Sequence, residues 1–296
     1  MINYLWLLIA TLLLAAEFGV QKLYQGRMGT SPKAGFFYNA MNGLFTVIIF
    51  FCVNGFKVTV TPFSVIMGIL MTGFAVFYSV IALGILKLGG MSVYTVFLMT
   101  GGMTLPYIYG LIFLDEEINI FRVIGLLVII VAVFVSGGGM KKVSPKLLAL
   151  CSAVFVLNGL VGIVSKQHQV EAASERFATA GTMDFVIITG AIKFIMCLVA
   201  YFIASAPKNA EKIEKKTALR ALPLVVIVAV VSGISYALQL VGASNLPASV
   251  MFPIITGGSI IFSSLAGKIF FKEKLSKLQW ISIAMCFIGT CLFLDL

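Results

Sequence analysis

Long apolar runs recur along this chain and constrain its fold more than any other feature. A membrane hydrocarbon core about 30 Å thick is crossed by about 20 residues of α-helix. Ten segments of this kind lie near residues 3–23, 35–55, 62–86, 90–113, 120–138, 145–166, 182–205, 221–243, 247–270 and 278–295. We therefore expect an all-α membrane protein with ten transmembrane helices.

The composition excludes an ordinary soluble protein. Apolar residues make up 60% of the 296 residues and charged residues 11%, whereas about 25% of a typical soluble domain is charged. So few polar side chains cannot cover the surface of a soluble core. The longest polar connection is 207–220, which leaves no room for a separate soluble catalytic domain.

The basic residues indicate how the helices are oriented. Sixteen Lys and Arg residues follow odd-numbered runs, and four follow even-numbered runs. Because such residues concentrate in cytoplasmic loops, we expect both termini to be extracytoplasmic in a bacterial-type inner membrane. The net charge of +10 is then a topology signal, with a secondary attraction to anionic lipid, and it does not indicate nucleic-acid binding.

Two helical segments repeat one another. The sequence of 96–117 matches that of 252–273, with identical spacing between the shared residues. These are Thr100, Gly101, Gly102 and Glu117 in the first copy and Thr256, Gly257, Gly258 and Glu273 in the second. Small residues let helices approach closely, so we interpret the Thr-Gly-Gly motifs mainly as packing sites.

The two copies must lie upside down relative to one another, because an odd number of helices separates them. A weaker match between 20–22 and 164–166 agrees with this arrangement. We expect two inverted five-helix repeats, the first over 1–140 and the second over 141–296. Such folds commonly place the substrate site near the membrane midplane, between the repeats.

Two charged residues lie well inside predicted spans. Glu17 follows about fourteen apolar or small residues, which puts it roughly 20–25 Å below the start of its helix. A carboxylate there is costly unless it pairs, faces water or carries a proton, so we interpret Glu17 as a proton or cation site. Lys193 is a candidate counter-ion to Glu17 or site for a substrate carboxylate. The alternatives are a hydrated interfacial glutamate and a lysine satisfied by helix carbonyls.

Other polar residues of the spans fall at spacings of three or four, which places each set on one helix face. The candidates for contact with substrate or water are Tyr38, Asn39, Asn42, Thr46, Asn158, Ser165, Ser232, Ser235, Tyr236 and Gln239. Hydrogen bonding between packed helices is the alternative reading of this set. Tyr78, Tyr94 and Phe97 flank the repeat motifs and are candidates for a cavity wall, since rings beside a carboxylate attract organic cations.

The sequence contains no recognisable catalytic or metal-binding constellation. We expect the sole histidine, His168, in an extramembrane loop and Asp184 near a membrane interface. The five cysteines lie in apolar runs without a CxxC pair, so we expect no disulfide framework, metal or cofactor. No GxxxxGK[ST] loop occurs, which excludes ATP hydrolysis by that device. The expected partners are a small-molecule substrate, protons and membrane lipid, with no nucleic acid, and the chain works as a monomer or homodimer.

Ten short-looped helices in inverted halves, with two matched helices each running into an acidic turn, resemble the ten-helix EamA-type members of the drug/metabolite transporter superfamily. The segment LAAEFGVQKL around Glu17 also resembles the first helix of the small multidrug resistance proteins, which carry an essential glutamate there. These resemblances imply proton-for-substrate exchange at Glu17 with alternating access, and they give Tyr94 and Phe97 the places of a helix-crossing tyrosine and its aromatic neighbour. The second half departs from the pattern, because Val161 stands where a glutamate would match Glu17.

We therefore expect a secondary active transporter rather than an enzyme. Its substrate is a small organic metabolite, an amino acid or an organic cation such as a quaternary amine, moved with a proton or by exchange. Lys193 favours a zwitterionic or acid-bearing solute over a simple cation. The alternative is a flippase or membrane-embedded enzyme acting on a lipid-linked substrate, for which 115–117 is the candidate acidic cluster.

Overall fold

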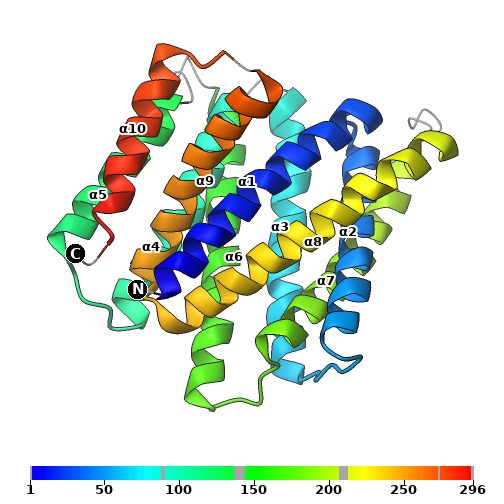
Figure 1. Ribbon diagram of the computed structural model, residues 1–296, viewed down its shortest axis with the longest axis horizontal. Helices are drawn as coiled ribbons and strands as arrows, with labels where there is room; N and C mark the ends of the chain where they lie inside the picture. The colour runs from blue at the N-terminus through cyan, green and yellow to red at the C-terminus, as the bar shows by residue number, and fades with distance from the viewer. Residues whose placement is uncertain (1, 88–90, 137–143, 207–212, 273, 295–296) are drawn as a thin grey trace.

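The structure is a computed structural model that describes residues 2–87, 91–136, 144–206, 213–272 and 274–294. Over these residues it consists of ten α-helices without a strand (Figure 1). They are α1 (Ile2–Met28), α2 (Pro32–Val53), α3 (Pro62–Lys87), α4 (Met91–Phe113), α5 (Ile120–Ser136), α6 (Pro145–Ser174), α7 (Thr182–Ser205), α8 (Lys215–Asn245), α9 (Ala248–Phe271) and α10 (Lys277–Cys291). The all-α prediction is confirmed.

Eight of the described helices are long and apolar enough to cross a membrane, and α5 and α10 are shorter apolar helices. Many large apolar side chains are exposed on the outside of the bundle, among them Phe77, Ile112 and Phe202. A soluble protein hides most residues of this kind, whereas lipid accepts them. The protein is therefore a multi-pass membrane protein.

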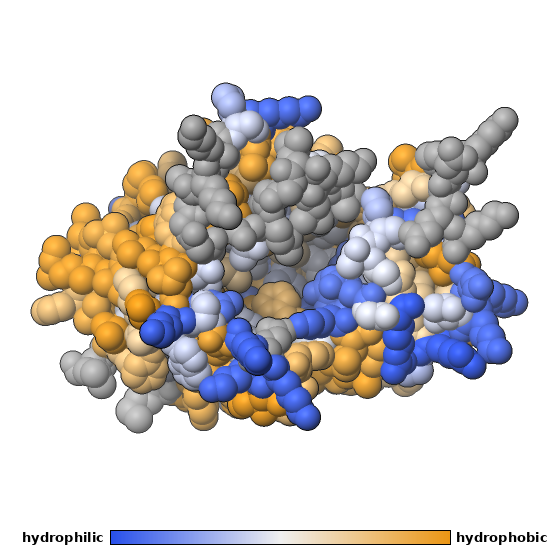
Figure 2. Space-filling model, turned by 90° about the horizontal axis from the view of Figure 1, so that it is seen from above, coloured by the Kyte–Doolittle hydropathy of each residue, from blue (hydrophilic) through white to orange (hydrophobic). Residues whose placement is uncertain are grey.

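Successive helices run in opposite directions, so their ends gather at two faces of the bundle (Figure 1). We call one the termini face, because Ile2 and the end of α10 at Cys291 both lie there. We call the other the basic face, because Arg27, Lys215 and Lys277 lie at helix ends on that side. Figure 2 looks onto the basic face and shows hydrophilic side chains gathered around a hollow.

The packing of the helices follows a regular pattern. Helix α1 packs on α8 and α9, and α6 packs on α3 and α4. The remaining large contacts are α2 with α7, α5 with α10 and α4 with α9. Exchanging each helix with the one five places along the chain turns α1–α8 into α6–α3 and α1–α9 into α6–α4, and it leaves the other three pairs unchanged.

Close backbone approaches allow these contacts. A Cβ atom at Gly43 of α2 would lie 2.7 Å from both the Gly190 carbonyl oxygen and the Phe194 amide nitrogen of α7. Real Cβ atoms do not approach backbone so closely, so only glycine fits at this crossing. The α2–α7 contact is thereby fixed beside the cavity described below.

Some helices extend further than their hydropathy predicts, most of all α6 and α8. Helix α6 continues to Ser174 instead of ending near 166, and α8 begins at Lys215 instead of near 221. The prediction of an extramembrane loop for His168 is wrong, because the residue is helical and fully buried. Its ring stacks on Phe185, with 3.7 Å between the ring centroids, so tertiary contacts stabilise a polar stretch of helix.

Candidate substrate cavity

A cavity of about 510 Å³ lies between α1, α2, α3, α6, α7, α8 and α9. Its polar lining includes one carboxylate, Glu17, and one ammonium, Lys193. The apolar part of the wall includes Leu14, Phe36, Met71, Val76, Val161 and Phe252. This volume accommodates a small organic solute, and the lining offers both charged groups and an apolar surface.

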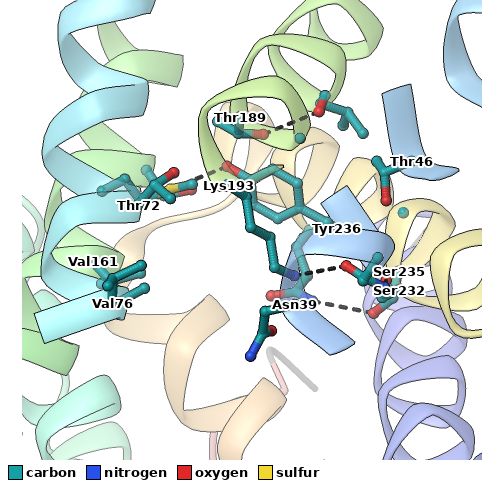
Figure 3. Close-up of a pocket in the computed structure, with 18 of the residues that line it drawn as sticks. Asn39, Thr46, Thr72, Val76, Val161, Thr189, Lys193, Ser232, Ser235 and Tyr236 are labelled. Atoms are coloured by element: carbon teal, nitrogen blue, oxygen red, sulfur yellow. Dashed lines mark hydrogen bonds between the residues drawn. The ribbon is translucent and has the colours of Figure 1, made fainter. Parts of the chain in front are cut away.

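The Lys193 side chain is held by a chain of hydrogen bonds that crosses three helices. Its ammonium donates to Asn42 Oδ1 at 2.7 Å, and Asn42 Nδ2 donates to Ser232 Oγ at 3.4 Å. Figure 3 shows Lys193 running beside the ring of Tyr236 toward Ser232. Asn42 is 2% exposed, so it keeps the ammonium in one position between α2 and α8.

The Lys193 ammonium has capacity left for a ligand. It carries three N–H donors, and within the described parts of the chain its hydrogen bond to Asn42 is the one that it forms. The remaining donors lie in the cavity that Lys193 lines. Ammonium donors of this kind form their strongest hydrogen bonds with ionised acceptors such as carboxylates.

Glu17 enters the same cavity from α1. Among the described residues its carboxyl group has no hydrogen-bond partner and no cation within 4.0 Å. Glu17 and Lys193 thus line one cavity without an ion pair between them.

The α8 side of the cavity is fixed by contacts to other helices. Ser235 Oγ donates to Ala10 O of α1 at 2.8 Å, and Gln239 Nε2 donates to Ser235 Oγ at 3.2 Å. Tyr236 OH lies 3.2 Å from Met71 Sδ of α3. These bonds join helices from both halves of the chain around the cavity.

The model of the EamA-like transporter family matches residues 145–294, which is half of the chain. The chain belongs to this family. Members of the EamA-like family are membrane transporters of small molecules, and the resemblance identified from the sequence is thereby confirmed.

A comparison of structures agrees with this assignment at the level of the fold. A solved crystal structure described only as "Crystal structure of protein" has a TM-score of 0.75 and 14% identity, and the match covers 98% of this chain and 95% of the other. At that identity the likeness shows a shared fold alone. No curated protein sequence matches this chain.

In this EamA-like fold most of the sequence-predicted site residues come together. The cavity is lined by Glu17, Asn39, Asn42, Thr46, Tyr78, Asn158, Ser165, Lys193, Ser232, Ser235, Tyr236 and Gln239. They come from α1, α2, α3, α6, α7 and α8, so segments far apart in the sequence meet at one place. Val161, the residue that matches Glu17 in the second half, also lines the cavity, so the described lining holds a single carboxylate.

Three of the predicted aromatic residues lie outside the lining. Tyr38 is buried against Tyr24, with ring centroids 4.8 Å apart. Tyr94 and Phe97 pack in an apolar cluster around Ile85. The prediction for Tyr38 rests on helical spacing, which allows a helix contact as well as a cavity contact. For Tyr94 and Phe97, proximity to a motif in the sequence does not fix which way a helix face turns. All three rings face neighbouring helices instead.

The first Thr-Gly-Gly motif lies at a helix contact and not in the cavity lining. Thr100 Oγ1 donates to Val96 O of its own helix at 2.7 Å. Gly101 lies against the backbone of Phe155 in α6, and a Cβ at Gly102 would lie 2.5 Å from Asn158 Nδ2. The motif therefore packs α4 on α6.

The second motif occupies the corresponding place in α9. The Thr256 carbonyl accepts a hydrogen bond of 2.9 Å from Ser259 Oγ. Gly257 faces Thr290 of α10, and a Cβ at Gly258 would lie 3.2 Å from the Thr11 side chain of α1. This motif packs α9 on α1 and α10. Glu273, which ends the second copy of the repeat, lies outside the described residues.

Sequence reasoning missed most of the α3 wall. Thr72, Ala75, Val76 and Ser79 line the cavity, and their spacing of three and four places them on one helix face. Hydroxyl and small side chains are inexpensive in a membrane, so their presence in α3 gave no sign of function. The helical spacing of these four residues was the signal from which this part of the cavity lining could have been predicted.

Proposed function

We propose that this protein is a secondary active transporter of a small zwitterionic metabolite, an amino acid or a close analogue. The observation that carries this proposal is the pair formed by Glu17 and Lys193, an acidic and a basic side chain that line one cavity without an ion pair between them. In this assignment the Lys193 ammonium binds the carboxylate of the solute, and Glu17 binds its ammonium.

Electrostatics favours a zwitterion over an organic cation. An uncompensated charge in a low-dielectric site costs several kcal/mol, and a zwitterion compensates both groups at once. A simple cation would neutralise Glu17 but would place a like charge near Lys193 in the same cavity. The apolar side chain of the solute then lies against residues such as Phe36, Val76 and Phe252.

Glu17 also couples the movement of the solute to the movement of protons. Without a solute its carboxyl group carries a proton, which removes the cost of an unpaired charge in the membrane. The incoming ammonium takes the place of that proton, which leaves to water. Proton and solute therefore compete for one carboxylate, and competition of this kind couples their movements in opposite directions.

The transport cycle alternates access between two inverted repeats, 1–140 and 141–296. The packing pattern supports this division, because exchanging helices five places apart preserves the main helix pairs. The basic face is cytoplasmic and the termini face is extracytoplasmic in the inner membrane, as the distribution of Lys and Arg favours. With that orientation, the hollow on the basic face (Figure 2) supports assigning this conformation as inward-open. One chain encloses the cavity, so a monomer suffices and a homodimer is compatible.

Transport by purified protein in proteoliposomes tests this function. The unsubstituted protein is expected to exchange a labelled amino acid across the membrane and to accumulate it when a pH gradient is imposed. Glu17→Gln is expected to abolish accumulation driven by the gradient, because the amide cannot carry the proton. Glu117→Gln removes a charge from an exposed loop position and serves as the matched control. Normal gradient-driven accumulation by Glu17→Gln would rule out the coupling role.

A further inference from the structure

The end of α8 is held by a buried lysine outside the cavity lining. Lys166 of α6 is 6% exposed. Its ammonium donates to Ala243 O at 2.6 Å and to Leu246 O at 2.7 Å. These carbonyls belong to the last turn and the C-cap of α8, where a cation complements the negative end of the helix dipole.

The start of α9 is held by a glutamate from the other side. Glu116, between α4 and α5, accepts hydrogen bonds from the backbone N–H groups of Ala248 at 2.5 Å and Ser249 at 2.8 Å. A carboxylate complements the positive end of the α9 dipole. A Cβ at Gly110 would lie 2.5 Å from Glu116 Oε2, so the glycine provides the room that this carboxylate occupies.

The turn from α8 to α9 is therefore clamped between α6 and the α4–α5 connection. All four hydrogen bonds join a charged group to the backbone, and bonds of this kind are stronger than neutral ones. They last only while α6 and the α4–α5 connection stay against the turn. Moving either one away would leave Lys166 or Glu116 without its backbone partners.

Other buried contacts join α6 to its neighbours on the same face. His168 Nε2 lies 2.8 Å from Ser64 Oγ of α3, and Ser244 Oγ of α8 donates to Gln169 Oε1 at 2.9 Å. The Ser64 hydroxyl also accepts a hydrogen bond of 2.8 Å from the Ala180 N–H, just before α7. The C-terminal part of α6 thus connects α3, α7 and α8 at the termini face.

Among the described residues, the basic face has its own contacts between helices, but no charged side chain there clamps a helix–helix turn in this way. Tyr24 of α1 donates a buried hydrogen bond to Ala34 O of α2 at 3.0 Å. There, Arg27 of α1 donates to Arg220 O of α8 at 3.1 Å in an exposed position. The hollow visible in Figure 2 opens on that face, whereas the clamp lies at the opposite helix ends (Figure 1). A solute that crosses the membrane through the cavity must pass the clamped face.

We propose that Lys166 and Glu116 form a latch that keeps the termini face closed in this conformation, and that its release opens the cavity to that face. Weakening the latch shifts the population toward the conformation open at the termini face. The inference rests on the alternating access proposed above, but its test requires no substrate and no proton gradient, so the two can fail separately.

The test measures access to a cavity residue from each side of the membrane. The five native cysteines are replaced by serine or alanine, and Thr72, which lines the cavity, is replaced by cysteine. Sealed vesicles of known orientation are then labelled with a membrane-impermeant maleimide. The starting protein is expected to react faster from the basic face than from the termini face.

Glu116→Gln and Lys166→Met are expected to raise the labelling rate from the termini face about tenfold, the shift that about 1.4 kcal/mol gives to an equilibrium. Glu116→Gln keeps an acceptor oxygen and the shape of the side chain, so it provides the test if Lys166→Met does not fold. Glu117→Gln and Lys57→Met remove charges at exposed positions on the same face and are expected to leave the rates unchanged. Unchanged rates in folded Glu116→Gln, or an equal rise in Glu117→Gln, would overturn the proposal.

Discussion

Asn42 is the residue on which the geometry of the candidate site depends most. Its amide links Lys193 on α7 to Ser232 on α8, so it sets the position of the ammonium that we assign to substrate binding. Its neighbour on the same helix face, Asn39, also lines the cavity, but its amide donates to the Gly35 carbonyl of its own helix at 3.0 Å. Substitutions at these two asparagines therefore separate two contributions to ligand affinity. One is the position of the Lys193 ammonium, and the other is the polarity of the cavity lining.

Asn42→Asp is expected to weaken binding of a zwitterionic solute at least about tenfold, a loss of about 1.4 kcal/mol. The new carboxylate lies where Asn42 Oδ1 already accepts from Lys193, so it pairs with the ammonium and competes with the carboxylate of the solute. Asn39→Asp is the matched control and is expected to change affinity much less. Isothermal titration calorimetry on purified protein measures both. A tighter complex with Asn42→Asp than with the unsubstituted protein would contradict the assignment of Lys193.

At the scale of single helices, α2 shows why small residues occur where they do. A Cβ atom at Gly43 would lie 2.7 Å from the backbone of α7, whereas a Cβ at Gly35 would meet nothing within 4 Å. The first glycine is therefore required by packing, and the second is not. The α2–α7 crossing also carries the hydrogen bond between Lys193 and Asn42, so helix packing and site geometry are linked at this point.

Gly43→Ala is expected to lower the free energy of unfolding by about 1–3 kcal/mol, because the added methyl group overpacks the crossing. Gly35→Ala, in the same helix, is expected to raise stability by about 0.5–1 kcal/mol, since alanine favours helix more than glycine does. Thermal unfolding of the two detergent-purified variants measures the difference. An unchanged or higher midpoint for Gly43→Ala would mean that the crossing is looser than described.

The sequence predicts some elements well because their signal is local. Apolar runs identify helices that face lipid, and a charge in such a run, as at Glu17 and Lys193, is costly enough to indicate a special environment. The end of α6 could not be found in this way. His168 and Lys166 are polar by composition, and their burial depends on partners in α3 and α8 that are distant in the sequence.

The distinction between local signals and long-range contacts also explains which residues of the cavity lining the sequence predicts. Asn42, Asn158 and Gln239 line the cavity as the helical spacing predicts, because amides inside a membrane need partners and turn toward the bundle interior. For Tyr94 and Phe97 the sequence offers a resemblance and a place beside the repeat motif, and neither feature fixes the rotation of α4. Aromatic rings are equally stable against another helix, which is where they lie.

At the scale of the whole molecule, we propose that the cavity and the latch lie along one route across the bundle. Helices from both halves of the chain form the cavity, a hollow opens on the basic face, and charged side chains clamp the opposite face. Of the acidic cluster at 115–117, the Glu116 carboxylate is used by the start of α9.

The central claim is that Glu17 and Lys193 together bind a zwitterion, and ligand-induced thermal stabilisation of the purified protein tests it most directly. Each apolar amino acid is compared with its carboxamide, which lacks the carboxylate, and with its N-acetyl form, which lacks the ammonium. The account predicts that the intact zwitterion stabilises the protein, by about 2.7 kcal/mol at about 100 times its Kd, that neither derivative does so, and that Lys193→Met abolishes the effect. Stabilisation by a carboxamide or a quaternary amine that persists in Lys193→Met would contradict the account and indicate a cation site at Glu17 alone.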